Sequence, residues 1–337
     1  MANCPENKLM AIAPILRASR SSPPRNFHFP GSARVPRAVS GVPPDTFEFS
    51  NCDKVGETPT STPGTGVLPG KKSAIVRLIA LLLLASPAYA ENKPESLAFG
   101  STENTGDALI GIFYDFKQNQ KGEPQRVDYF QVVGEFLNSG WDENTLSRFF
   151  RVTRPIYGTQ VFIPNIGAGA GPKAFHVEDV VKPEQWIVVY KGQVSPPEDG
   201  TYRFVGIADD ALAVAVNGKT SLVSHFGGWA NYSSWKEPEP DKPNLRVGSG
   251  KLRHGDWFEA KQDEIIDLDI LIGEFPGTAF GAALLIEKKG VDYPLVDVPG
   301  FGKIPAYPVF QVRAQEIAPG NYGVPFTSDS PPWKCHQ

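Results

Sequence analysis

The sequence predicts an all-β protein, an antiparallel β-sandwich that carries a small helical insertion. Several short apolar runs alternate with a period of two, the pattern of strands with one buried face. The clearest of them, residues 200–219, contains the Asn217-Gly218 pair, whose preference for positive φ is typical of a tight hairpin turn. Two helices are expected between residues 125 and 150, and we interpret them as an insertion on the sandwich.

Residues 200–219 hold two apolar runs separated by Asp209 and Asp210. We expect both runs to be strands that form a three-stranded meander with residues 220–224, so that the two aspartates lie at a loop tip. The second run, residues 211–216, has only alanines on one face and leucine and valine on the other. Another layer should therefore lie close against the alanine face, while the larger side chains fill the core of the sandwich.

Residues 202–219 resemble the central signature of the PA14 domain. They read Tyr-x-Phe, a short apolar spacer, Asp-Asp, an apolar alternation and then x-Asn-Gly-Lys. The PA14 domain is a β-sandwich module of secreted adhesins, glycosidases and toxin components, and the resemblance implies this fold for residues 106–289. The chain is also similar to secreted bacterial PA14-like proteins of unknown role. It differs from the family pattern at Ala211, where glycine is usual, and at Asn217, where aspartate is usual.

The composition excludes some classes of protein. The 337 residues are enough for one large domain or two small ones, and a hydrophobic content of 41% is ordinary for a globular protein. A net charge of −4 gives no basic field for nucleic acid. Cys4, Cys52 and Cys335 do not form a disulfide framework.

The first hundred residues read as export and linker sequence. Residues 1–70 are rich in proline, serine and threonine, and we expect them to be disordered or a mis-called extension of the reading frame. Residues 71–90 have two lysines, an apolar run and an Ala-x-Ala ending, the three parts of a signal peptide. A membrane anchor is less favoured, because the run is shorter than the roughly 20 residues that span a bilayer. We expect a linker at residues 91–105 and a secreted or periplasmic, cell-envelope location.

The remaining elements follow from periodicity and turn signals. Helices are expected at residues 125–138 and 143–150, and a flexible loop at 167–172. Residues 226–250 form a long aromatic loop, and residues 290–337 a Pro/Gly-rich C-terminal tail with at most one strand, 309–312, and a frayed end. Further strands are expected at residues 108–114, 159–163, 186–190, 257–262, 265–272 and 278–287.

Asp209 and Asp210 are the candidate metal ligands. In calcium-binding PA14 lectins the equivalent acid pair reaches one ion through a cis peptide, so the resemblance implies Ca²⁺ at these residues. Carboxylate oxygens also suit a hard cation chemically. The alternative is that both acids cap a turn and hold loop amides.

Aromatic residues of the long loop are the candidate ligand-binding groups. Trp229, Tyr232 and Trp235 are suited to stacking on sugar rings. Asn231 is a further ligand-binding candidate, from the loop groups expected to complete the site. The alternative is that the aromatic side chains plug the end of the sandwich.

We see no catalytic motif. An adjacent acid pair does not supply the two carboxyls, about 5 Å or more apart, that a glycosidase needs, and nothing in the spacing of Glu237 or Glu239 supports pairing with Asp209. The sequence therefore predicts a secreted, non-catalytic, carbohydrate-binding module that depends on calcium, with no membrane span in the mature chain. The alternative is a structural or assembly protein of the cell envelope that binds a protein partner.

Overall fold

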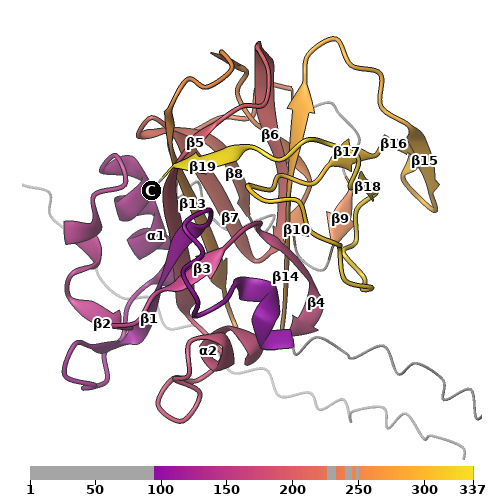
Figure 1. Ribbon diagram of the computed structural model, residues 1–337. Helices are drawn as coiled ribbons and strands as arrows, with labels where there is room; N and C mark the ends of the chain where they lie inside the picture. The colour runs from indigo at the N-terminus through magenta and orange to yellow at the C-terminus, as the bar shows by residue number, and fades with distance from the viewer. Residues whose placement is uncertain (1–94, 226–232, 240–244, 248–249, 337) are drawn as a thin grey trace, which may run out of the picture. The chain divides into compact units, whose positions relative to one another are not determined.

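The computed structural model describes residues 95–225, 233–239, 245–247 and 250–336. Two antiparallel sheets pack face to face (Figure 1), so the expected all-β sandwich is confirmed. The extension at 1–70, the leader at 71–90 and the first residues of the linker lie outside the described residues.

The larger sheet has eight strands in the order β2-β1-β5-β13-β7-β8, with β3 beside β1 and β19 beside β5. Its strands are β1 (Leu109–Asn119), β2 (Phe149–Arg151), β3 (Ile156–Gly158), β5 (Trp186–Ser195), β7 (Ala211–Val216), β8 (Lys219–His225), β13 (Ile266–Glu274) and β19 (Lys334–His336).

The smaller sheet has five strands in the order β11-β6-β14-β4, with β12 beside β6. Its strands are β4 (Phe162–Gly167), β6 (Gly200–Asp209), β11 (Arg253–His254), β12 (Phe258–Ala260) and β14 (Ala279–Lys288). The remaining elements are η1 (Glu95–Phe99), α1 (Tyr129–Asn138), η2 (Glu143–Leu146), α2 (Ala170–Ala174), β9 (Arg246–Val247), β10 (Gly250–Lys251), β15 (Leu295–Val298), β16 (Gly302–Pro305), β17 (Tyr307–Pro308) and β18 (Phe326–Thr327).

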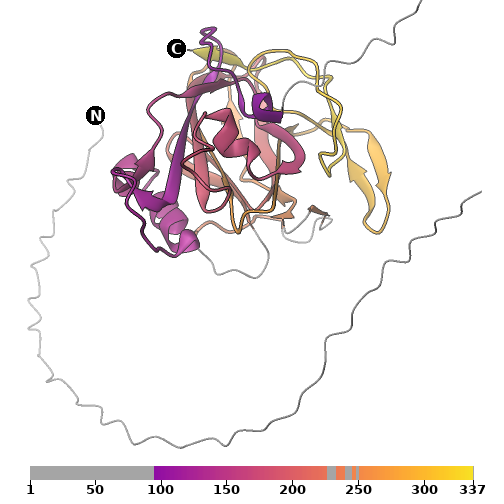
Figure 2. The ribbon, with the colours of Figure 1, turned by 90° about the horizontal axis from the view of Figure 1, so that it is seen from below.

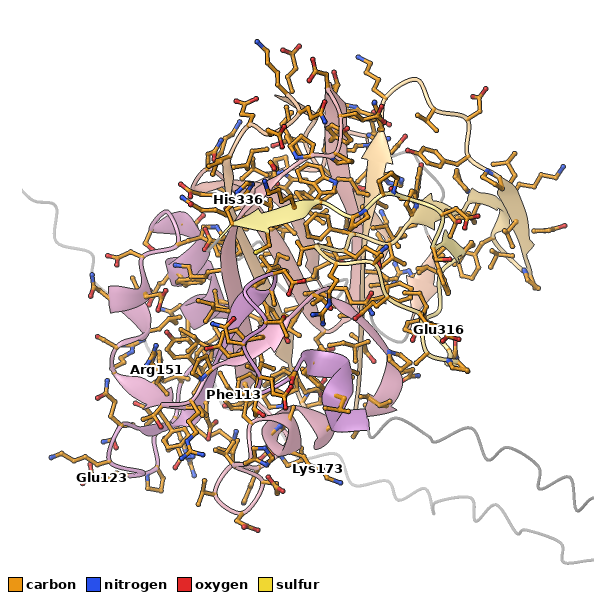
Figure 3. The ribbon with its side chains drawn as sticks, in the orientation of Figure 1. Phe113, Glu123, Arg151, Lys173, Glu316 and His336 are labelled. Atoms are coloured by element: carbon orange, nitrogen blue, oxygen red, sulfur yellow. The ribbon has the colours of Figure 1, made fainter. Side chains whose placement is uncertain are left out.

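The core between the sheets is built from the alternating faces that the sequence predicts. Leu212 and Val214 of β7 and Ile270 of β13 are fully buried in it. Figure 3 shows Phe113 among the crowded side chains of the interior, whereas Lys173 points outward. The period of two therefore identifies the inward face of these strands correctly.

The alanine face of β7 is covered by α1. Ala211, Ala213 and Ala215 are buried in a second cluster that includes most of the apolar side chains of this helix, and Figure 1 shows α1 beside the larger sheet. Asp128 caps the start of the helix, and its side chain accepts a hydrogen bond from the amide of Gln131. The expected close layer is thus confirmed, and it is the helical insertion itself.

The predicted three-stranded meander is wrong in its first half. Asp209, the last residue of β6, pairs with Gly281 of the smaller sheet, whereas Ala211 pairs with Gly273 of the larger sheet. The chain therefore crosses from one sheet to the other at Asp210. Periodicity does not distinguish this crossing from a hairpin, because both join two strands by a short polar link. The β7–β8 hairpin is confirmed.

Other segments are more ordered than the sequence indicates. Residues 143–150 hold the short η2 and part of β2 in place of a helix, and residues 167–172 run into α2. In the expected linker, Phe99 is buried against Trp186. Composition alone misses this single aromatic anchor.

The segment 290–336 packs onto the sandwich instead of fraying. Phe310 and Trp333 are buried in the core, where they contact each other and Phe310 contacts Phe204, and β19 extends the larger sheet along β5. Its proline and glycine content conceals a few large apolar anchors, which are enough to fix a long irregular segment. None of the helices in the described part of the chain has the length and apolar character to cross a membrane.

Candidate functional site

Asp209 and Asp210, which we call the acid pair, lie where the chain passes between the sheets. The peptide bond that joins them is cis. Asp210 is buried, whereas Asp209 is partly exposed. The backbone amide of Asp210 donates to the carbonyl of Gly273 at 3.3 Å, and its Oδ2 accepts from the amide of Phe275 at 2.8 Å. The second contact is the amide-holding role that the alternative interpretation gives to these acids.

A third carboxyl, Glu274, adjoins the acid pair. It is 1% exposed, and its Oε1 accepts from the amide of Gly277 at 2.7 Å, while its Oε2 is buried and has no hydrogen-bond partner among the described residues. Burial first, and then the negative charges of Asp210 and Asp209, raise the pKa of Glu274 to about 9. Glu274 is therefore protonated and neutral at pH 7.

Sequence analysis missed Glu274 although a signal was present. The inward face of β13 consists of the even-numbered residues from Ile266 to Ile272, and Glu274 is the next residue in that series. Since the predicted strand ended at Ile272, the glutamate appeared to belong to a loop. A glutamate that continues a buried apolar face is a candidate functional residue, because an unpaired carboxyl is costly to bury.

The register of β8 places the end of this strand beside the acid pair. His225, the last residue of β8, pairs with Ala211, the residue directly after the acid pair. The described part of β8 therefore ends beside Asp210. Trp229, Asn231 and Tyr232 lie outside the described residues, so their roles stay predictions.

Trp235 lies in the described part of the same loop. Its indole N–H donates to Oδ2 of Asp256 at 3.3 Å, and its ring packs partly buried against both the core between the sheets and the cluster under α1. These contacts correspond to the plug of the alternative interpretation. A sugar-stacking role for Trp235 stays a prediction.

The two glutamates of the long loop form ion pairs with arginine side chains. Glu239 pairs with Arg203 at 2.9 Å, and Glu237 pairs with Arg253. Both carboxylates are thus ion-paired to arginines of the smaller sheet, where they neutralise buried or partly buried charge. This is a structural role, and it explains why the loop carries the Glu-Pro-Glu sequence.

The ligand atoms that the acid pair offers are of the type that a hard cation prefers. Its two carboxylates supply the oxygen ligands that Ca²⁺ prefers. Within the described residues, however, no group of three or more His, Cys, Asp or Glu side chains is placed to hold a metal ion. Asp209 and Asp210 would hold the ion, and any further ligands have to come from beyond the described residues or from backbone and water oxygen.

Comparison with known proteins yields similar structures but no family. No protein-family model matches the chain, and no curated protein matches it. A PA14 sugar-binding domain from an RTX adhesin is 15% identical, with a TM-score of 0.29, over 56% of this chain and 93% of that one.

Two other structures show a comparable degree of similarity. The A domain of epithelial adhesin 6 from Candida glabrata, solved in complex with Galβ1-3GlcNAc, is 10% identical with a TM-score of 0.31, over 60% of this chain and 91% of that one. A β-glucosidase from Kluyveromyces marxianus, in complex with glucose, is 16% identical with a TM-score of 0.29, over 58% of this chain and 19% of that one.

Proposed function

We propose that the protein is a non-catalytic carbohydrate-binding module in which the acid pair holds a Ca²⁺ ion that contacts sugar hydroxyls. The observation that carries the proposal is the placement of the acid pair, at the end of β6 and directly beside the residue where β8 runs into the loop 226–232. Ca²⁺ takes six to eight oxygen ligands, so two carboxylates leave positions for loop groups and for hydroxyls of a ligand. The resemblance of residues 202–219 to the PA14 signature supports the same assignment.

Location follows from the same proposal. The signal-peptide pattern at residues 71–90 supports export, and a module that binds glycans through calcium is suited to the cell surface or the extracellular space, where free Ca²⁺ is abundant. Calcium sites of extracellular modules typically have dissociation constants of about 10⁻⁴ to 10⁻³ M, too weak for the ion to bind at the low free Ca²⁺ of the cytoplasm.

A second candidate function is the binding of a protein partner in the cell envelope. The observation that favours it is the hairpin of β15 and β16, which stands away from the sandwich in both views (Figures 1 and 2). Leu295 and Phe301 of this hairpin are 60% and 41% exposed. Exposed apolar side chains clustered on one projection are a feature of protein interaction sites.

The test of the first proposal separates a metal role from a hydrogen-bonding role of Asp210. Thermal unfolding is recorded in excess Ca²⁺ and in EDTA for the wild type, Asp210→Asn and Asp210→Ala. Asparagine retains an acceptor for the amide of Phe275 but loses the charge, whereas alanine loses both. A glycan array in Ca²⁺ and in EDTA completes the experiment.

A calcium-binding module predicts that Ca²⁺ raises the melting temperature of the wild type by several degrees and of neither variant, because an ion bound only to the native state stabilises it. Glycan binding should then require Ca²⁺. If Asp210 serves only to hold the amide, Ca²⁺ changes no melting temperature, Asp210→Asn remains as stable as the wild type, and Asp210→Ala alone is destabilised by about 1–3 kcal/mol. That outcome would overturn the calcium proposal and direct attention to an envelope partner.

A further inference from the structure

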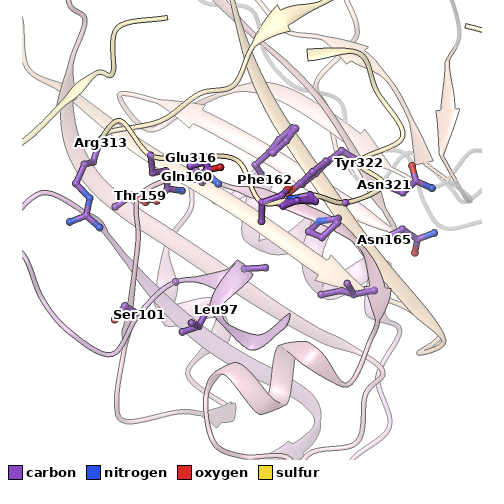
Figure 4. Close-up of a pocket in the computed structure, with 18 of the residues that line it drawn as sticks. Leu97, Ser101, Thr159, Gln160, Phe162, Asn165, Arg313, Glu316, Asn321 and Tyr322 are labelled. Carbon is purple, nitrogen blue, oxygen red and sulfur yellow. Dashed lines mark hydrogen bonds between the residues drawn. The ribbon is translucent and has the colours of Figure 1, made fainter. Parts of the chain in front are cut away.

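A pocket of about 660 Å³ opens between three segments that are far apart in the sequence. Residues 97–101, residues 157–166 and residues 313–322 form its walls. Figure 4 shows Leu97 and Ser101 on one side, opposite Gln160 and Phe162. The volume lies within the roughly 300–1,000 Å³ of small-molecule sites.

Backbone hydrogen bonds fix the walls of the pocket. Ser101 and Tyr157 exchange two of them, at 3.0 and 2.7 Å, and the amide of Asn165 donates to the carbonyl of Asn321 at 2.8 Å. The hydroxyl of Thr159 donates a hydrogen bond of 2.9 Å to the side chain of Gln315, which belongs to the wall formed by residues 313–322. Because each wall is tied to another, the pocket is formed before any ligand arrives, which lowers the entropy cost of binding.

The polar groups of the pocket are mainly neutral. Its carboxamides and aliphatic hydroxyls belong to Ser101, Thr159, Gln160, Asn165, Gln315 and Asn321. A carboxamide offers both donors and acceptors, and so does a sugar hydroxyl. The charged lining residues are Arg313 and Glu316, one of each sign, and Arg313 pairs with Asp107 at 3.2 Å. The walls therefore do not favour a strongly charged ligand.

Gln160 lines the pocket with a carboxamide that the fold leaves without a hydrogen-bond partner among the described residues. Its Oε1 is covered. Since no hydrogen bond fixes the amide plane, the carboxamide is free to rotate about its last side-chain torsion when a ligand binds. Phe162 and Tyr322, stacked with ring centroids 4.1 Å apart, add an aromatic wall next to it.

We propose that this pocket, the carboxamide pocket, binds a neutral polyhydroxylated ligand of one or two sugar rings without the help of a metal ion. It is separate from the acid pair: β14 lies between them, with Asp209 paired to Gly281 on one side and Ile166 of the pocket paired to Phe280 on the other. The inference therefore goes beyond the calcium-dependent site and does not depend on it.

The experiment is isothermal titration calorimetry of the full-length protein in EDTA. The probes are glucose, galactose, N-acetylglucosamine, maltose and cellobiose. Gln160→Met keeps the length of the side chain and removes its hydrogen-bonding groups. Gln311→Met is the matched control, because Gln311 bridges to Gln160 across the backbone and also has a buried Oε1 without a described partner, yet does not line the pocket.

At least one probe should bind the wild type and Gln311→Met in EDTA, and Gln160→Met should lose about tenfold in affinity, the effect of one to two lost hydrogen bonds. All three proteins should unfold within about 2 °C of one another, since neither substitution breaks a bond of the folded protein. Asn165→Ala, at an exposed position of the wall, gives a second variant with the same expected direction should Gln160→Met fail to fold.

Two results would overturn the proposal. One is that no probe binds in EDTA, and the other is that both wall variants bind as the wild type does. Binding that requires Ca²⁺ and disappears in Asp210→Asn would assign the sugar to the acid pair, which supports the proposed function and rejects the carboxamide pocket. Binding in EDTA that Gln160→Met weakens, with no effect of Ca²⁺ on any melting temperature, would support the carboxamide pocket and reject the proposed calcium site.

Discussion

Two buried ionisable side chains, Arg203 and Glu274, have opposite electrostatic surroundings. Arg203 is 1% exposed, yet its guanidinium donates to Glu287 at 2.6 Å and to Glu239 at 2.9 Å, and it lies 4.2 Å from the ring centroid of Trp257. Two nitrogens and one face of this cation therefore meet groups that stabilise its charge.

Glu274 is as deeply buried but has acids as neighbours. Burial raises the pKa of the Glu274 carboxyl, and the charges of Asp210 and Asp209 raise it further, to about 9, so the carboxyl stays protonated at pH 7. Arg203 is therefore buried among groups that stabilise its charge, whereas Glu274 is buried among groups that oppose the ionised form of its carboxyl.

The largest expected effect breaks the compensated group. Arg203→Met should lower the free energy of unfolding by about 3–5 kcal/mol, because it leaves the largely covered carboxylate of Glu287 without its cation. The measurement is urea unfolding, read as a change in the midpoint at constant slope. The control is Arg148→Met, since Arg148 and its partner Glu135 are 56% and 49% exposed and such pairs contribute under about 1 kcal/mol. Equal effects of both substitutions would contradict the assignment of Arg203.

The next effect tests the pKa of Glu274 through the pH dependence of stability. The pKa of Glu274 is raised from 4.5 to about 9, so between these values the folded protein retains a proton that the unfolded chain releases. The stability that this group contributes is complete below pH 4.5 and is lost as pH rises towards 9. In EDTA, the wild type should therefore lose up to about 1.4 kcal/mol per pH unit between pH 6 and pH 8 relative to Glu274→Gln. If the free energies of unfolding of the two proteins instead change with pH by the same amount across this range, Glu274 is ionised in the native state.

Much of the fold was predictable from local patterns. Alternation identified the inward residues of β7 and β13, and Asn217 and Gly218 adopt the positive φ angles, 50° and 73°, that the hairpin turn requires. What local patterns did not predict is which sheet a strand joins. The crossing at Asp210 and the docking of β19 onto β5 depend on contacts between residues far apart in the sequence.

The candidate site was predictable only in part, for a similar reason. Two adjacent aspartates are visible in any sequence, whereas Glu274 joins them only because β13 pairs with β7 in a given register. The carboxamide pocket has no signal at all in the sequence. Its Gln160 and Asn321 are ordinary polar residues until three separate segments are brought together.

The smallest effect sharpens the comparison by dividing the compensation of Arg203 between its two carboxylates. Glu239 is 40% exposed and Glu287 only 14%, so water screens the first interaction far more than the second. Glu239→Gln should cost at most about 1 kcal/mol, whereas Glu287→Gln should cost about 1.5–3 kcal/mol, the range for a hydrogen bond to a charged group. Both substitutions keep the size and an acceptor oxygen, so the difference in urea midpoint reports on charge alone. Equal costs would mean that the loop carrying Glu239 excludes water from Arg203 as completely as the sheet does, and that the compensation extends to the surface of the molecule.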